Sequence, residues 1–233
     1  NADDIWLKRR YNDRVHAALI AKNMNNNYQA SRFYFESARF ANELVELNEN
    51  LDKNGKILWL TQAYKGYITS IILKNEKNMF TAIAHASAGK IAKTMYELTQ
   101  KDMWLDIWYQ EQLRSAEESQ QKHAVYSYIH TADAAYEKFI KKKNWQAGKD
   151  AYTAEINAFL IAKSLDYETR IDMFPQIIRK LKDIIIDMHN ETKNPEWEER
   201  YYKNLVAIAE ANMDNGIGED IYRDLKSMTM RAC

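Results

Sequence analysis

The feature that most constrains this chain is a spaced pattern of aromatic and small residues that follows a polar elbow three times. After the elbow comes a large residue, then a small residue three positions on, a further residue after seven and a small one after ten. The copies are Tyr28-Ser31-Phe35-Ala38, Met79-Ala82-Ala86-Gly89 and Trp145-Gly148-Tyr152-Glu155, the last with glutamate where a small residue is expected. These positions share one helical face, where small residues let a neighbouring helix approach closely. The pattern predicts tightly packed helical hairpins.

Residues that form turns are scarce, with 6 Gly and 2 Pro among 233 residues. Average proteins contain roughly 7% Gly and 5% Pro. Because strands and hairpins need such residues, the composition favours long helices joined by short polar elbows. Periodicity predicts an all-α chain of about ten helices, at residues 2–23, 27–48, 56–75, 79–99, 102–121, 123–142, 145–165, 175–190, 195–213 and 218–229.

Several helix ends are predicted from capping residues. Residues 48–55 are rich in Asn, Asp and Gly and are expected to form the clearest loop. Asp102 is a candidate cap, and Pro175 is expected in the first turn of a helix that follows a break near residue 166. Asn194 before Pro195 predicts another helix start, and residues 214–216 predict a stop.

Length and charge limit the class of protein. A chain of 233 residues without a long linker predicts a single domain spanning residues 1–233. Lys plus Arg and Asp plus Glu number 33 each, which argues against a nucleic-acid partner. The sequence has no apolar run of the roughly 18–20 residues that a membrane-spanning helix needs. The lone Cys233 leaves no intrachain disulfide.

No residue pattern supports catalysis or metal binding, so the sequence predicts neither an enzyme nor a cofactor. None of the five histidines lies three or four residues from another, and Glu-x-x-His and Gly-x-Ser-x-Gly motifs are absent. The pairs Asp102/Asp106 and Asp183/Asp187 are interpreted as solvated faces or caps. The lysines between Lys138 and Lys149 could dock an acidic partner, but a solvated elbow is the simpler interpretation.

Tyr28-Ser31-Phe35-Ala38 resembles the second helix of a tetratricopeptide repeat, and Trp145-Gly148-Tyr152 is similar to the same helix. The resemblance implies antiparallel helical hairpins stacked as a right-handed solenoid, and a non-enzymatic scaffold or adaptor that binds a protein or peptide. In such stacks the first helix of each pair lines the groove. The positions carried over to this chain are Asp13, His16, Asn23, Tyr64, Tyr67, Lys74, His130, Asp133 and Glu137.

Alternatives remain open at this point. The groove could hold no ligand, or the chain could be an extracytoplasmic helical protein that binds a small molecule for a transport system. A closed pocket with a buried Tyr64 or Tyr67 would favour the small ligand, and an open groove would favour a peptide. The start without methionine fits a trimmed cytoplasmic chain or a processed periplasmic or extracellular one. Ile221, Leu225 and Met228 form a stripe that packs inward or seats a second copy in a homo-oligomer.

Overall fold

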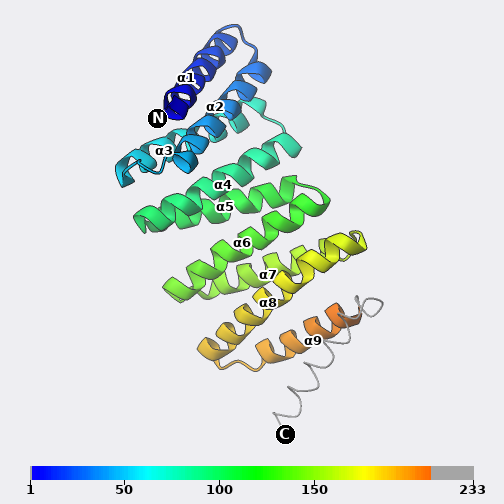
Figure 1. The fold of residues 1–233 in the computed structure, drawn as a ribbon. Helices are drawn as coiled ribbons and strands as arrows, with labels where there is room; N and C mark the ends of the chain where they lie inside the picture. Colours follow the sequence, from blue (N-terminus) through cyan, green and yellow to red (C-terminus); the bar gives the residue numbers. More distant parts are fainter. Residues whose placement is uncertain (1, 211–233) are drawn as a thin grey trace. The chain divides into compact units, whose positions relative to one another are not determined.

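The computed structural model describes residues 2–210, which fold into nine α-helices and no strand (Figure 1). The helices are α1 (Ala2–Asn23), α2 (Asn27–Leu47), α3 (Lys53–Lys74), α4 (Met79–Thr99), α5 (Asp102–Glu118), α6 (Gln121–Lys142), α7 (Trp145–Ala162), α8 (Tyr167–Thr192) and α9 (Glu196–Glu210). The all-α prediction is confirmed. The helix expected at 218–229, the stop at 214–216 and the stripe that begins at Ile221 lie outside the described residues.

The helices fall into two compact units. The first spans Asn1–Ala134 and contains α1 to α5 with most of α6, and the second begins at Ala135. In the first unit each helix packs on the next, from α1 on α2 to α4 on α5. In the second unit α8 packs on both α7 and α9. Neighbouring helices that follow short elbows run antiparallel (Figure 1).

Each helix that carries the aromatic and small pattern begins after an asparagine N-cap. The caps are Asn26, Asn78 and Asn144, whose side chains accept hydrogen bonds from the first backbone N–H groups of α2, α4 and α7. Asn25 and Lys143 precede two of these caps with φ of 57° and 50°. Such left-handed residues end a helix sharply, so the same local geometry closes α1 and α6.

Two predicted helix ends are wrong. The expected loop at 48–55 is shorter, because Asp52 Oδ1 accepts the N–H of Gly55 at 2.8 Å and starts α3 at Lys53. Asp102 does not cap α5, because Lys101 occupies the N-cap position without a side-chain hydrogen bond and Asp102 lies in the first turn. There its charge still favours the helix N-terminus.

The prediction that Pro175 begins a helix is also wrong, although the break near residue 166 is confirmed. Asp166 caps α8, accepting from the N–H and the hydroxyl of Thr169 at 2.9 Å each. Pro175 therefore lies inside α8, where it lacks the N–H of a regular helix turn. The adjacent Met173 and Phe174 are buried, and this packing holds the helix through the proline.

The core of the first unit combines alanines with large aromatic residues. Its buried members include Ala38, Ala63, Ala84, Ala88 and Ala92 together with Tyr67, Trp104 and Trp108. The alanines bring helices close: a Cβ on Gly66 of α3 would lie 2.9 Å from the Cβ of Ala38 on α2. The aromatic rings fill the space between the closely packed backbones.

The core of the second unit is more aliphatic. Along α8, Ile177, Leu181, Ile184, Ile185 and Met188 are buried and Ile178 is half-buried. Gly148 of α7 packs against this helix, since an added Cβ would lie 2.2 Å from Met188 Sδ and 3.2 Å from a ring carbon of Phe139. The small residue in the third copy of the pattern thus admits a neighbouring side chain.

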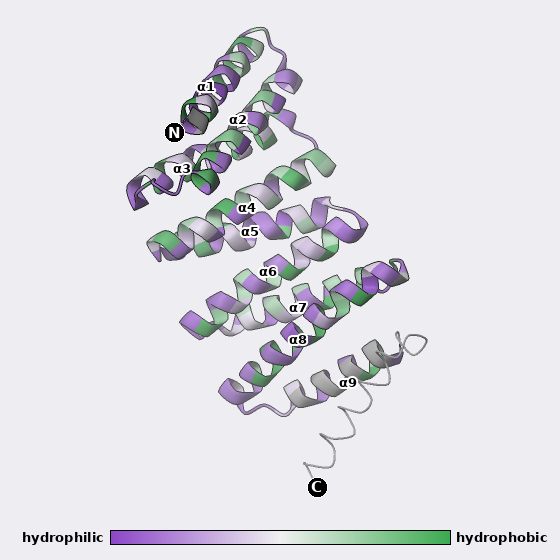
Figure 2. Ribbon diagram, viewed as in Figure 1, coloured by the Kyte–Doolittle hydropathy of each residue, from purple (hydrophilic) through white to green (hydrophobic). Residues whose placement is uncertain are grey.

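Hydrophobic and hydrophilic residues are interleaved along α1 to α8 (Figure 2). This distribution is that of amphipathic helices packed on one another. Within residues 2–210, no helix combines the length and apolar character needed to cross a membrane.

Candidate functional site

A pocket of about 560 Å³ lies where α7, the end of α8 and the start of α9 meet, and is named here the α7–α9 pocket. Its aromatic walls are Trp145 and Tyr152 from α7 and Trp197 from α9. Trp145 is the first residue of α7, directly after its cap, and Tyr152 lies two turns later on the same face. The repeated pattern therefore places both rings on one side of the pocket.

Neighbouring side chains anchor two of the three aromatic walls. Tyr152 and Trp197 meet edge to face with ring centroids 5.7 Å apart. Asn204 Nδ2 donates to the Tyr152 hydroxyl at 2.7 Å. Trp145 contacts Phe139 at 5.9 Å yet remains 38% exposed, whereas Trp197 is 5% exposed. A ligand would meet one accessible indole and two anchored rings.

Two cations lie at this pocket. The Arg200 guanidinium stands 5.2 Å from the ring centroid of Trp197 and 5.8 Å from that of Tyr152. It also donates to Glu196, a hydrogen bond that lowers the pKa of the Glu196 carboxyl and raises the pKa of Arg200. Lys149 is exposed on α7 between the two wall residues Trp145 and Tyr152. The pocket joins apolar ring surface to a net positive edge.

A second pocket, of about 270 Å³, has the same plan in the first unit and is named the α2–α4 pocket. It lies between the start of α2, the end of α3 and the start of α4, lined by Tyr28, Arg32, Lys74 and Phe80 among others. Tyr28, Arg32 and Phe80 correspond to Trp145, Lys149 and Trp197, each 117 residues later. The ring pair Phe35–Phe80, at 5.1 Å, matches the pair Tyr152–Trp197.

The groove residues carried over from the resemblance lie in different surroundings. Asp13, His16 and Asn23 are exposed on α1. Tyr64 packs edge-on against Trp104 with centroids 5.5 Å apart. Burial raises the pKa of Tyr64 to about 12, an effect that the nearby Glu111 carboxylate reinforces.

Tyr67 is buried against Phe35, with centroids 5.2 Å apart, and its hydroxyl bonds to Ser87. Lys74 lines the α2–α4 pocket, where its ammonium lies 4.9 Å from the ring centroid of Tyr28.

The three remaining groove residues lie on α6. His130 Nδ1 is 3.7 Å from Asp133 Oδ2 in the first unit, and Glu137 pairs with Lys141 at 3.4 Å in the second. Of the nine groove residues, only Lys74 lines one of the two aromatic pockets. The pattern did identify Tyr28 and Trp145, but sequence reasoning assigned them to helix packing rather than to a pocket.

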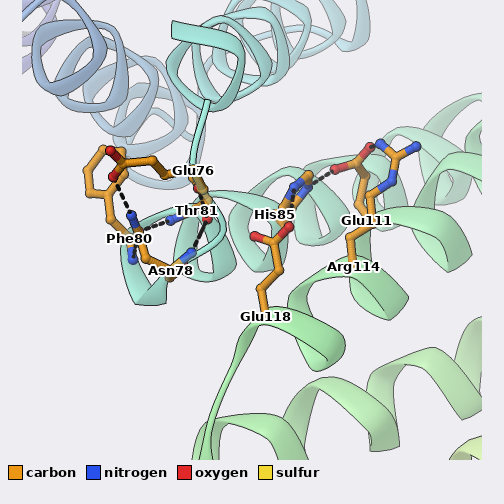
Figure 3. A network of polar contacts seen from close by, with 8 residues as sticks. All are labelled: Glu76, Asn78, Phe80, Thr81, His85, Glu111, Arg114 and Glu118. Atoms are coloured by element: carbon orange, nitrogen blue, oxygen red, sulfur yellow. Dashed lines mark hydrogen bonds and ion pairs between the residues drawn. The ribbon is translucent and has the colours of Figure 1, made fainter. Parts of the chain in front are cut away.

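A buried polar cluster lies between α4 and α5 (Figure 3). His85 Nδ1 lies 2.6 Å from Glu111 Oε2, and its Nε2 lies 3.9 Å from Glu118 Oε1. Arg114 reaches the other oxygen of Glu111 at 3.4 Å. The cluster links the two helices. Among residues 2–210, no group of three His, Cys, Asp or Glu side chains has the arrangement of a metal site.

Comparison with known proteins adds no family assignment. No family model matches the chain, and a search of curated proteins found no match.

Proposed function

We propose that this chain is a non-enzymatic, tetratricopeptide-like scaffold that binds a peptide segment of a partner protein in the α7–α9 pocket. The observation that carries the proposal is that the exposed Trp145 lines the same pocket as the anchored rings of Tyr152 and Trp197. Tyr and Trp side chains offer large contact areas with few torsions to freeze, and such residues dominate binding energy at protein interfaces.

The charges indicate which peptides would fit. Arg200 and Lys149 lie beside the aromatic walls. Glu196, the one carboxylate among the described residues that line the pocket, is already bonded to Arg200. An acidic side chain of the peptide would meet Lys149 while an adjacent aromatic or aliphatic side chain covers Trp145. The preferred segment therefore joins an apolar anchor to an acidic residue.

Preorganisation supports binding rather than simple core packing. Tyr152 is held by the Asn204 amide and by Trp197, and Arg200 is held by Glu196 and both rings. Because these side chains are already ordered, a peptide that binds there loses less free energy to side-chain ordering.

We also propose that the helices pair as hairpins, because the same local structure recurs before α2 and before α7. The elbows before α2 and α7 share a left-handed residue followed by an asparagine cap. Both lead into a helix with an aromatic start and a buried small residue, Ser31 or Gly148. Stacked hairpins of this kind place equivalent helix ends in equivalent surroundings, so recurring pockets are expected.

Selection of peptides from a displayed random library tests the proposal. We expect the chain to enrich peptides that combine an acidic residue with an apolar anchor. Trp145→Ala should weaken their binding by about tenfold or more, the loss expected for an interface anchor. The matched control is Trp6→Ala, which removes another half-exposed tryptophan, on α1. Enriched peptides that bind both variants equally, or no enrichment at all, would contradict the proposal.

A further inference from the structure

The outward face of α1 carries large apolar side chains that are exposed to solvent. Ile5 is 72% exposed, Ile20 is 49% exposed and Met24 is 75% exposed. The opposite face of α1 packs on α2, where Leu7 is buried beside Leu44. Within the first unit α1 lies at the end of the row of helices (Figure 1). Exposed apolar surface that is concentrated on one helix face marks an interaction site.

The exposed residues of α1 are arranged symmetrically about the middle of the helix. Residues that are three or four positions apart share one face of a helix. One line of exposed side chains, named here the α1 row, runs along the helix at spacings of four, four, three, four and four residues: Ile5, Arg9, Asp13, His16, Ile20 and Met24. Because the spacings are the same in both directions, the α1 row can face a copy of itself that runs antiparallel.

Antiparallel pairing brings complementary side chains together at the centre of the α1 row. A two-fold axis midway between Asp13 and His16 sets Asp13 of each copy level with His16 of the other copy. Both side chains are exposed. The Asp13 carboxylate can accept a hydrogen bond from the imidazole, and the bond is charge-assisted when the imidazole is protonated. Parallel packing would instead set Asp13 against Asp13, so the charges favour the antiparallel pair.

The same axis gathers the exposed apolar residues at the two ends of the pair. Ile5 of one copy lies level with Met24 of the other copy, and Ile20 of that copy follows one turn further in. Trp6 stands beside Ile5 and meets Phe40 of α2 edge to face, with ring centroids 6.1 Å apart. Each end therefore joins apolar side chains from both copies, which removes their surface from water.

Arg9 connects the polar centre to the apolar ends. It lies level with Ile20 of the other copy and four residues before Asp13 of its own helix. Its aliphatic stem can cover Ile20 while the guanidinium turns back to the Asp13 carboxylate. The pair therefore leaves no cation of the α1 row against an apolar side chain without a counter-charge.

From this arrangement we infer that α1 is a docking surface for a second copy of this chain, which packs antiparallel along the α1 row. The helix has 22 residues and is about 33 Å long at 1.5 Å per residue. A single pair of such helices gives an interface at the small end of the specific range, so we expect a reversible dimer with a roughly micromolar dissociation constant.

The polar centre of the α1 row favours a second copy over a membrane surface as the partner. A helix that lies in the interface of a bilayer presents an apolar face along its length, with its cations on the other face. In the α1 row, Arg9, Asp13 and His16 interrupt the apolar residues. The inference does not depend on peptide binding, because α1 belongs to the first unit and the α7–α9 pocket to the second.

A charge swap at the centre of the α1 row tests both the surface and its antiparallel direction. Sedimentation equilibrium of the chain over a range of concentrations measures the association. His16→Asp should weaken it by about tenfold or more, because two pairs of like charges then meet across the axis. Adding Asp13→His to that variant restores the opposite pairs and should recover most of the affinity. The matched control is His123→Asp, the same change at an exposed histidine of α6, which should leave the association unchanged.

A second pair of variants tests the apolar ends. Ile20→Asp should weaken the association by about tenfold or more, because it places a carboxylate among the apolar residues at each end. Ile72→Asp, the same change at an exposed isoleucine of α3, is the control and should have no effect. Circular dichroism checks that each variant keeps its helices, and every substituted residue is exposed.

Three results would overturn the inference. The unaltered chain could stay monomeric at every concentration tested. A dimer could form with the same affinity in His16→Asp and Ile20→Asp, which would place its interface elsewhere. The chain could stay monomeric and sediment with vesicles of anionic phospholipid, and lose that binding in Ile20→Asp, which would make α1 a membrane-binding helix instead.

Discussion

The α2–α4 and α7–α9 pockets share one local plan but differ in what they leave accessible. In the α2–α4 pocket Lys74, the last residue of α3, extends over the Tyr28 ring and pairs with Glu76 at 3.0 Å. The last residue of α8 is Thr192, whose hydroxyl donates back to the Met188 oxygen at 2.7 Å. Glu191, which stands 117 residues after Lys74, pairs with Lys143. The α7–α9 pocket has a volume of about 560 Å³ and the α2–α4 pocket one of about 270 Å³.

The helix contacts beside the two pockets differ as well. Ser31 of α2 donates to the backbone oxygen of Ser70 at 2.9 Å, a polar contact with α3. Its counterpart Gly148 makes an apolar contact with Met188. The elbow and the residue spacing that follows it place a pocket at the same point of each hairpin. The side chains at the helix ends determine how accessible that pocket is to a ligand.

The largest expected effect concerns the ring that closes each pocket. Trp197→Ala should destabilise the second unit by about 3–5 kcal/mol, because it removes a buried indole and the partner of Tyr152. Phe80→Ala, at the half-buried counterpart, should cost less. Urea unfolding curves measure both. Equal losses of unfolding free energy in the two variants would show that the two rings contribute equally to stability. That result would contradict the difference described between the pockets.

Alkaline pH should weaken the first unit through Tyr67. Burial raises the pKa of Tyr67 from 10.0 to about 12, although the Ser87 hydrogen bond opposes the rise. The stabilisation is fully present below pH 10 and declines as the pH rises towards 12, because the unfolded chain loses the proton first. The loss should approach 3 kcal/mol, at about 1.4 kcal/mol per pKa unit.

The control for this effect is Tyr67→Phe, which keeps the ring and removes the ionisation. Its stability should fall less steeply between pH 10 and 12 than that of the unaltered chain, as followed by thermal unfolding. Identical slopes would show that Tyr67 ionises as readily in the folded state as in the unfolded one.

Gly148→Leu should destabilise the second unit by about 1–3 kcal/mol, because the new side chain overlaps Met188 and Phe139. At the counterpart, Ser31→Ala keeps the volume nearly constant and should cost only about 1 kcal/mol for the lost hydrogen bond. Melting temperatures of the two variants measure the difference. An unchanged melting temperature for Gly148→Leu would remove Gly148 from the α7–α8 contact.

Exchanging the helix-end residues should have the smallest effect on stability and the clearest effect on binding. Thr192→Lys should change the free energy of unfolding by no more than about 0.5 kcal/mol, as is usual for surface substitutions. It should weaken selected peptides several-fold by covering Trp145. Lys74→Thr, the reverse change, serves as the control and should leave those peptides unaffected. Isothermal titration calorimetry measures the affinities, and full affinity in Thr192→Lys would contradict the account of the two pockets.

Sequence reasoning succeeded where the determinants are local. The small residues Ser31 and Gly148 and the break near residue 166 follow from neighbouring residues in the chain. Pro175 was misplaced because the rule for first-turn prolines ignores the burial of Met173 and Phe174. Tertiary packing overrode a local preference there.

The pockets could not be predicted because they join helix ends that are far apart in the sequence. Trp145 and Trp197 form one site only because α8 returns the chain to the start of α9. The groove positions carried over from the resemblance favoured the first helix of each pair, whereas the aromatic pockets begin on α2 and α7.

The most direct test of the central claim is fluorine NMR of the chain labelled with 5-fluorotryptophan, titrated with a library-selected peptide. Two of the six tryptophans, Trp145 and Trp197, line the α7–α9 pocket, and the other four lie in the first unit. The account predicts that the signals of Trp145 and Trp197 shift together with one affinity while Trp6, Trp59, Trp104 and Trp108 stay in place. Shifts confined to tryptophans of the first unit would contradict it.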